Sequence, residues 1–191
     1  EATSIPDDTY RSLRAMPGVA QAANITYLTM QVRKGDRDVR AMVVGVTPGE
    51  AGTPGWPPHL IAGRQITRSH YEAVADAATG FQLGDVIGIR RHQYKVVGMT
   101  RRMVSSNGDP MVYIPLKDAQ QAQFLKDNDA IWQSRRRIEA NPAFNRPGVP
   151  GLMEAVTASQ TSNSMVNAVL VTLEPGHDAD EVAGDLRRWK R

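Results

Sequence analysis

FQLGDVIGIRRHQYKVVGMTRRMVSSNGDPMVYIPL, residues Phe81–Leu116, is the stretch of sequence that decides the fold. Its β-branched and aromatic residues come in three short runs bounded by Gly, Asn, Asp or Pro, a pattern typical of strands. The predicted strands are Val86–Ile89, Tyr94–Met99 and Met111–Ile114. Because a polar connection joins each run to the next, the pattern predicts a three-stranded antiparallel meander.

The first fifty residues predict a helix followed by two strands. Apolar residues at three-residue spacing favour a helix over Asp7–Met16, with Asp7 or Asp8 as its N-terminal cap. Alternation of side chains indicates a strand over Val19–Val32. After a short polar turn, Val39–Val46 is apolar enough to be a strand buried on both faces.

The middle of the chain is rich in turn signals. Thr47–Pro58 holds four of the twelve prolines, so it predicts a loop or hinge. A short strand is expected at Ala73–Ala75. Good helix formers predict a helix over Lys117–Ile138, and a proline-rich linker follows at Asn141–Gly151.

The end of the chain predicts a buried strand, Asn167–Leu173, and a helix, Asp178–Trp189, with acidic residues first and basic residues last. This unit has no obvious partner in the middle of the chain, whereas the start of the chain offers a helix and two strands. We therefore expect an α+β protein in which residues 1–49 plus 164–191 form one discontinuous domain and residues 50–163 form an inserted, mostly β domain.

Composition excludes several classes of function. The 191 residues include no cysteine, so disulfides, thiol catalysis and cysteine-based metal sites are excluded. The net charge of +3 is modest. No apolar run reaches the length of a membrane span, and the first residue is Glu, so we expect the chain to be a segment of a longer protein.

No group of residues has the spacing of a catalytic or metal site. His59, His70, His92 and His177 are scattered, and Asp76–Gly80 is best interpreted as a turn. We therefore predict no catalytic residue, no metal ligand and no cofactor. The clustered arginines, Arg101–Arg102 and Arg135–Arg137, leave a basic binding module for nucleic acid or acidic polysaccharide as an alternative, which steep salt dependence of binding would reveal.

Six segments, taken together and in order, resemble the MacB-like, or FtsX-like, family of ABC transporter permeases, which includes the DevC and lipoprotein-release exporters. The segments are LRAMPGV (13–19), VVGVTP (43–48), LIAGRQI (60–66), LGDVI (83–87), YKVVGM (94–99) and MVYIPL (111–116). Each is weakly specific alone. The arginine-rich and proline-rich region between Gln120 and Pro150 departs from the family pattern.

The resemblance implies a fold and a mechanical role. In the family, a porter-like β-α-β part from both chain ends carries an inserted β-rich part, called the sabre, on the periplasmic side of the bacterial inner membrane. Apolar helices are expected before Glu1 and after Arg191. The domain would be non-catalytic and would couple ATP hydrolysis, by a separate or fused nucleotide-binding domain, to export of a substrate, with no nucleic acid as partner.

The resemblance also implies a periplasmic adaptor, or membrane fusion protein, and an outer-membrane channel as partners. Adaptors dock on membrane-distal loops in this family. The loop from Arg101 to Pro110 and the segment Asn141–Gly151 are therefore the predicted contact regions. Within the loop, the candidate contact residues are Arg101, Arg102, Ser105, Asn107 and Asp109.

Overall fold

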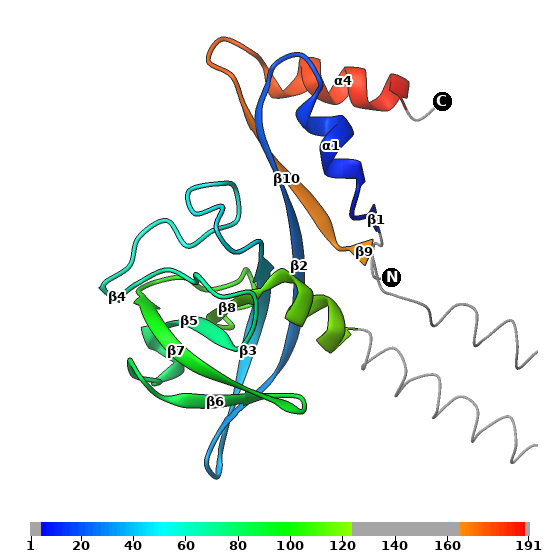
Figure 1. Cartoon of the computed structure of the whole chain (residues 1–191). Coiled ribbons are helices and arrows are strands. Elements are labelled where there is room, and N and C mark those ends of the chain that lie inside the picture. Colours follow the sequence, from blue (N-terminus) through cyan, green and yellow to red (C-terminus); the bar gives the residue numbers. More distant parts are fainter. Residues whose placement is uncertain (1–4, 124–164, 190–191) are drawn as a thin grey trace, which may run out of the picture.

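The computed structural model describes residues 5–123 and 165–189 (Figure 1). The described residues form a mixed α+β structure dominated by β-sheet, which confirms the predicted fold class. The elements are β1 (Ile5–Pro6), α1 (Thr9–Arg14), β2 (Val19–Lys34), β3 (Arg37–Val46), β4 (Ala62–Gly63), β5 (Glu72–Asp76), the 3-10 turn η1 (Ala77–Thr79), β6 (Val86–Ile89), β7 (His92–Thr100), β8 (Met111–Pro115), β9 (Met165–Val166), β10 (Ala168–Leu173) and α4 (Ala179–Trp189).

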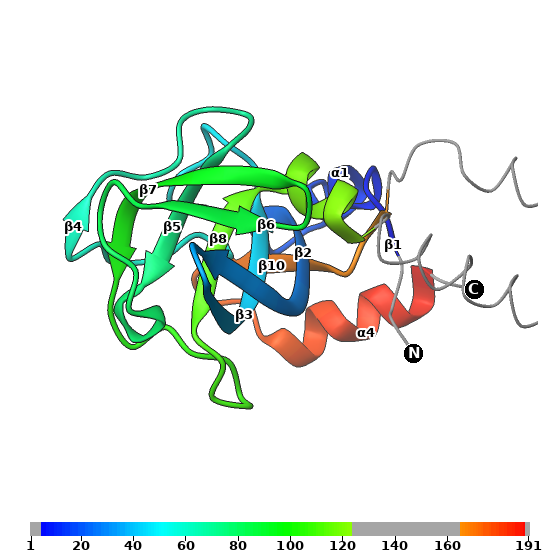
Figure 2. The same ribbon diagram turned by 90° about the horizontal axis from the view of Figure 1, so that it is seen from below.

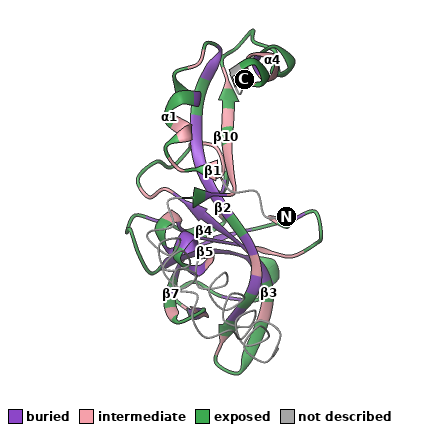
Figure 3. Cartoon of the chain, turned by 90° about the vertical axis from the view of Figure 1, so that its right-hand side faces the viewer, coloured by how far each residue is buried: buried purple, intermediate pink, exposed green. Residues whose placement is uncertain are grey.

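The long strand β2 belongs to two parts of the molecule at once. Its first half pairs antiparallel with β10, from Val19↔Leu173 to Ile25↔Ala168. Its second half, from Thr26, forms a hairpin with β3 that turns at Gly35, whose φ of +57° suits a residue without a side chain. Figures 1 and 3 show β2 running without interruption from the part that holds α1, β10 and α4 into the part that holds β3 to β8.

Six strands close into a ring. Hydrogen-bonded neighbours follow the order β2, β3, β8, β5, β7 and β6, and β6 pairs again with β2 through Val32↔Ile89 (Figure 2). Most neighbours are antiparallel, but β3 with β8 and β5 with β7 are parallel. Closure leaves these strands with few free edges, which protects them from pairing with other chains.

Alternation of side chains sends one set of residues into the ring and the other outward. The interior is filled by apolar side chains from all six strands, among them Val32, Val43, Ile89, Val96 and Val112, each at most 1% exposed. Residues one position away, such as Val44, Val74 and Tyr113, face outward, where Trp56 and Ile66 of the loop between β3 and β5 cover them. The connection between β3 and β5 therefore covers the outer face of β3, β8 and β5 through Trp56 and Ile66.

The predicted three-stranded meander is wrong in its strand order. The hairpin of β6 and β7 is present, but β5 lies between β7 and β8, parallel to the first and antiparallel to the second. The short strand expected at Ala73–Ala75 is therefore the centre of this layer. All five residues of β5 are buried, so its backbone N–H and C=O groups need hydrogen-bonding partners on both edges, and β7 and β8 supply them.

Two further expectations need correction. The strand predicted as buried at Asn167–Leu173 is present as β10, but its residues are half-buried or exposed, because it lies at the end of the strand order and pairs only with β2 among the described strands (Figure 3). Asp8 occupies the N-cap position of α1, but its side chain makes no capping hydrogen bond.

The helix predicted over Lys117–Ile138 begins as expected, since residues 116–123 are helical, and Ala119 and Ala122 pack against the interior cluster. The remainder of that helix, the linker Asn141–Gly151 and the clustered Arg135–Arg137 lie outside the described residues. Helix α4 is present as predicted, with Val182 buried. None of the helices in the described ranges combines the length and apolar character needed to span a membrane.

The division into residues 1–49 plus 164–191 and residues 50–163 stays a prediction. The pairing of β2 with β10 does bring the two chain ends together, as that division requires. The hairpin of β2 and β3 pairs with β6 and β8, so its strands are hydrogen-bonded to the inserted segment.

Candidate functional site

The loop between β7 and β8, residues 101–110, is held in one shape by its own hydrogen bonds. The backbone N–H of Ser105 donates to the Asp109 carbonyl at 2.8 Å, and the Gly108 N–H donates to the Ser105 carbonyl at 2.9 Å. The Ser105 hydroxyl accepts from the Asp109 N–H at 3.1 Å. An isolated bridge between Val104 and Pro110 closes the base of this small hairpin, which projects from the sheet in Figure 2.

A buried carboxylate, Asp76, anchors the loop to the sheet. Its side chain is completely buried, and one oxygen accepts from the Thr100 hydroxyl at 2.9 Å and from the Met103 N–H at 2.8 Å. The other oxygen accepts from the Ala78 N–H at 2.9 Å and so caps η1. A buried carboxylate needs such partners, so Asp76 fixes where the loop leaves β7.

The five residues predicted to contact a partner fall into two groups. Arg101, Arg102 and Asn107 are exposed, and Arg102 adopts a φ of +65°. Ser105 is 7% exposed and is used inside the loop, while the Asp109 carboxylate lies 3.2 Å from the Arg40 guanidinium on β3. The structure therefore places all five in one loop but presents only the first three outward; their contact with a partner stays a prediction.

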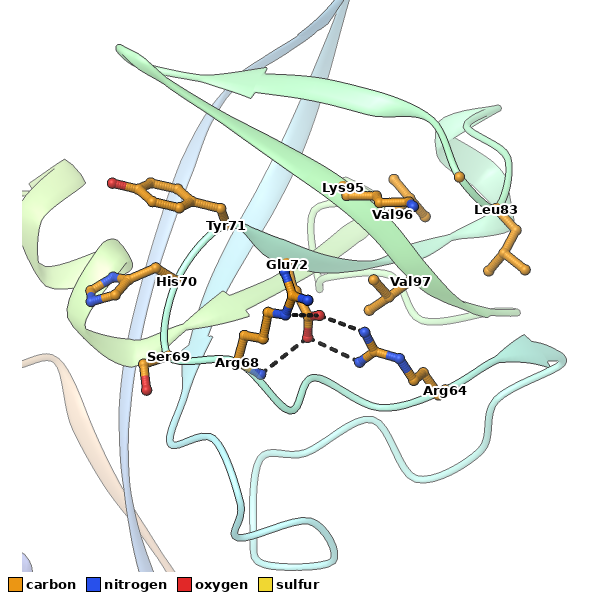
Figure 4. Close-up of a pocket in the computed structure, with 11 residues that line it drawn as sticks. Arg64, Arg68, Ser69, His70, Tyr71, Glu72, Leu83, Lys95, Val96 and Val97 are labelled. Atoms are coloured by element: carbon orange, nitrogen blue, oxygen red, sulfur yellow. Dashed lines mark hydrogen bonds and ion pairs between the residues drawn. The ribbon is translucent and has the colours of Figure 1, made fainter.

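A cavity of about 690 Å³ lies on the outer face of β5 and β7 (Figure 4). The segment from Arg64 to Glu72 forms one wall, and β7 forms another through Lys95 and Val97. Leu83 lies at one end. The segment approaches β7 closely because Gly63 and Gly98 are paired: a Cβ on Gly63 would collide with the Val97 carbonyl, and one on Gly98 with the Arg64 carbonyl.

Glu72 organises the wall of this cavity. Its carboxylate is 4% exposed and receives two hydrogen bonds from the Arg64 guanidinium, at 2.5 and 3.0 Å. Backbone N–H groups of Thr67 and Arg68 donate to it at 2.9 and 3.1 Å. The bonds from Arg64 and then the backbone bonds lower the pKa of Glu72 to about 2, although burial acts in the opposite direction. The carboxylate is thus charged and already fully engaged.

A third buried carboxylate, Asp118, ties the segment from Arg64 to Glu72 to the helical residues 116–123. It lies 2.6 Å from the His70 Nδ1 and accepts from the Tyr71 N–H at 3.1 Å. Tyr71 adopts a φ of +63°, and its ring lies within 6.0 Å of the rings of His70, His92 and Tyr94. Burial, followed by the charge of Asp118, raises the pKa of Tyr94 above its ordinary value.

A histidine held by a carboxylate is the arrangement of a general base, but the neighbouring Ser69 is not directed at His70. Figure 4 shows the Ser69 hydroxyl turned away from the His70 ring. Within residues 5–123 and 165–189, no group of three or more His, Asp or Glu side chains is placed to hold a metal ion. Within the part of the chain that the structure describes, the contacts of Asp118 with His70 and Tyr71 position a loop.

Sequence reasoning missed Asp76, Glu72 and Asp118 as structural anchors. For Asp76, the spacing to Thr79 and Gly80 suits a capped turn, so its local role could be inferred. Its contact with Met103, and that of Asp118 with His70, join residues 27 and 48 positions apart. No local pattern signals pairs so distant in sequence.

Comparison with known proteins agrees with this geometry. The family model described as the MacB-like periplasmic core domain matches residues 1–189. No curated protein sequence matches the chain significantly.

Three solved structures share the fold. The extracellular domain of the noncanonic ABC-type transporter YknZ from Gram-positive bacteria is 15% identical, with a TM-score of 0.56, over 95% of this chain and 78% of that one. The periplasmic region of MacB from Actinobacillus actinomycetemcomitans is 13% identical, with a TM-score of 0.58, over 98% and 72%. A domain of a putative permease from Porphyromonas gingivalis is 13% identical, with a TM-score of 0.54, over 98% and 77%.

At these identities the solved structures establish a common fold, and the match of the family model over nearly the whole chain establishes the relationship. The resemblance inferred from the six sequence segments is confirmed: this chain belongs to the family of MacB-like periplasmic core domains.

Proposed function

We propose that this chain is the extracytoplasmic domain of an ABC transporter permease and that it transmits ATP-driven conformational change to the export of a substrate. It does so without catalysing a reaction, on the periplasmic side of the bacterial inner membrane. The family assignment supports this proposal over a basic binding module. The ATPase subunit or domain, a periplasmic adaptor and an outer-membrane channel are the partners of such a transporter.

The observation that carries the proposal is the continuous strand β2. Its 16 residues extend over about 50 Å at ~3.3 Å per residue. One half of β2 is hydrogen-bonded to β10 and the other half to β3 and β6. Because one strand is bonded to both parts of the molecule, a rotation of either part also moves β2. A force applied near α1 and α4 would therefore be transmitted along β2 to the closed ring of six strands.

The coupling role is tested by softening β2 where its pairing changes from β10 to β3. In the full-length permease, the double variant Thr26→Gly/Tyr27→Gly should reduce export several-fold while basal ATP hydrolysis is retained, because glycine adds backbone freedom. The matched control is Gln31→Gly/Arg33→Gly, at exposed positions near the far end of β2. Equal export in both variants and the wild type would contradict a rod-like role for β2.

We also propose that the loop of residues 101–110 is a docking point for the adaptor. It projects from the sheet, is held rigid by Asp76, and presents the two exposed cations Arg101 and Arg102. A preorganised loop loses little conformational entropy on binding, which favours recognition.

Docking is tested by charge reversal. Arg101→Glu/Arg102→Glu should lower adaptor capture by the full-length permease about ten-fold at low salt, with less effect at high salt. Arg11→Glu/Arg14→Glu, a pair of exposed arginines in α1, is the matched control. Unchanged capture in the loop variant, or equal loss in the control, would exclude the loop as the docking point while leaving the role of β2 untouched.

A further inference from the structure

The cavity on the outer face of β5 and β7 is lined by three cations, Arg64, Arg68 and Lys95, and Glu72 can neutralise only one of them. Glu72 is bound by Arg64 and by two backbone N–H groups, so its acceptor capacity is taken up. Arg68 is 80% exposed at its side chain and forms only a long ion pair with that same carboxylate, at 3.7 Å, as the second cation on a group that Arg64 already neutralises. Among the described residues, no carboxylate forms an ion pair with Lys95, which is also exposed and lines the cavity.

The same cavity has an apolar side. Val97 is half-buried on β7, two positions from Lys95, so the two side chains leave the strand on the same face. Leu83 is 50% exposed at one end of the cavity, where it packs against Gly63. Leu83 and Val97 both line the cavity, so together they offer an apolar surface that the apolar body of a ligand can contact. Figure 4 shows Leu83, Val97 and Lys95 on one side, with the rings of His70 and Tyr71 turned away from them.

The geometry points to a binding site for an amphipathic anion, in which Lys95 and Arg68 neutralise a carboxylate, sulfonate or phosphate and Leu83 with Val97 contacts an apolar body. The volume of about 690 Å³ suits a ligand of ordinary small-molecule size. The wall that carries Arg68 is fixed in advance by Glu72, and β7 fixes Lys95 through backbone hydrogen bonds, including that from the Lys95 N–H to the Tyr71 carbonyl at 3.0 Å. The backbone of both walls is thus in place before a ligand arrives.

Three probes separate the anion from the apolar body: naphthalene-2-sulfonate carries both, naphthalene-2-methanol only the apolar body, and methanesulfonate only the anion. Each is titrated into the 191-residue chain while backbone amide chemical shifts are followed by NMR. Saturable shifts confined to residues 64–72, 83–84 and 95–97 are expected for naphthalene-2-sulfonate, with at least ten-fold weaker binding of the other two.

Variants of the chain identify the residues. Lys95→Gln should weaken naphthalene-2-sulfonate about three- to five-fold through loss of a partly exposed ion pair, and Leu83→Ser by a similar factor through loss of apolar contact. Arg91→Gln, an exposed cation in the turn between β6 and β7, and Val86→Ser, an exposed apolar residue on β6, are the matched controls and should change affinity less than about two-fold.

Several results would overturn the proposal. These are no saturable shift at these residues with millimolar naphthalene-2-sulfonate, equal binding of the uncharged probe, or equal loss of affinity in the control variants. Because the probe titration needs neither the adaptor nor ATP hydrolysis, its failure would leave the mechanical function standing. Failure of the β2 and loop tests would likewise leave this site intact.

Discussion

Neutralising Glu72 gives the sharpest test of how the wall of the cavity is held. The variant Glu72→Gln keeps the size of the side chain but removes its charge, so the Arg64 guanidinium loses the partner that it binds through two nitrogens. The backbone N–H groups of Thr67 and Arg68 keep an oxygen to donate to. The NH2 group of the new amide then faces the Arg64 guanidinium, so the variant removes the charge together with one acceptor and keeps the packing.

The size of the effect follows from the pKa of Glu72, which folding lowers from 4.5 to about 2. A lowered pKa in the folded state adds stability that is fully present above pH 4.5 and is lost as the pH falls toward 2. A shift of this size corresponds to about 3 kcal/mol at most. Because Arg64 is half-exposed, solvent screens the pair, and we expect about 1–2 kcal/mol.

The assay is urea-induced unfolding, followed by circular dichroism at pH 6, 4.5, 3.5 and 2.5. The free energy of unfolding of the wild type should fall more steeply than that of Glu72→Gln over this range, and the two should differ by about 1–2 kcal/mol at pH 6 and converge toward pH 2. The control is Glu174→Gln, an exposed glutamate in the turn before α4; its unfolding should follow the wild type at every pH.

Two outcomes would refute this reasoning. Parallel pH profiles for the wild type and Glu72→Gln would mean that the ion pair does not contribute to stability. A difference between them that grows as the pH falls would mean that the sign is wrong.

Two further predictions concern the backbone and the loop. Gly63→Ala should destabilise the chain by roughly 2–4 kcal/mol in urea unfolding, because φ is +75° and the new Cβ would meet the Val97 carbonyl. Gly108→Ala, at φ +82° with nothing within 4 Å, should cost only about 1 kcal/mol, and equal losses would exclude a steric cause. Asp76→Ala should lower stability by about 2–4 kcal/mol, since it leaves the Met103 N–H and Thr100 hydroxyl without their acceptor. It should also speed tryptic cleavage after Arg101 or Arg102; unchanged cleavage would mean that Asp76 does not hold the loop.

The sequence predicts where the strands lie along the chain better than it predicts which strands pair with one another. The alternation over Val19–Val32 and the apolar run at Val39–Val46 reflect burial of each strand, so β2 and β3 could be located from local pattern alone. The order of strands depends on which surfaces meet, and no local pattern records that β5 pairs with both β7 and β8. The apolar composition of Asn167–Leu173 suggested burial, but β10 is the last strand of the described sheet order and remains partly exposed.

For the candidate site too, the sequence predicts the location of the loop but not the contacts of its side chains. Turn-forming residues between two strands located the loop of residues 101–110. The inward orientation of Ser105 and the contact of Asp109 with Arg40, 69 positions away, depend on tertiary structure. The cavity was not predicted at all, because its walls are brought together by Asp118 and by the pairing of Gly63 with Gly98.

The double pairing of β2 also sets the order in which the chain can fold. The partner of its first half, β10, is made late, and the hydrogen bond from the Tyr27 N–H to the Asn167 side chain joins residues 140 positions apart. During synthesis from the N-terminus, the ring of six strands can close first. Until β10 is made, the edge of residues 19–25 that pairs with β10 has unpaired backbone N–H and C=O groups. Contacts so distant in sequence form slowly, and an unpaired edge invites aggregation. We expect completion of this half of β2 to be the slow step of folding and the stage at which a newly synthesised chain most needs protection.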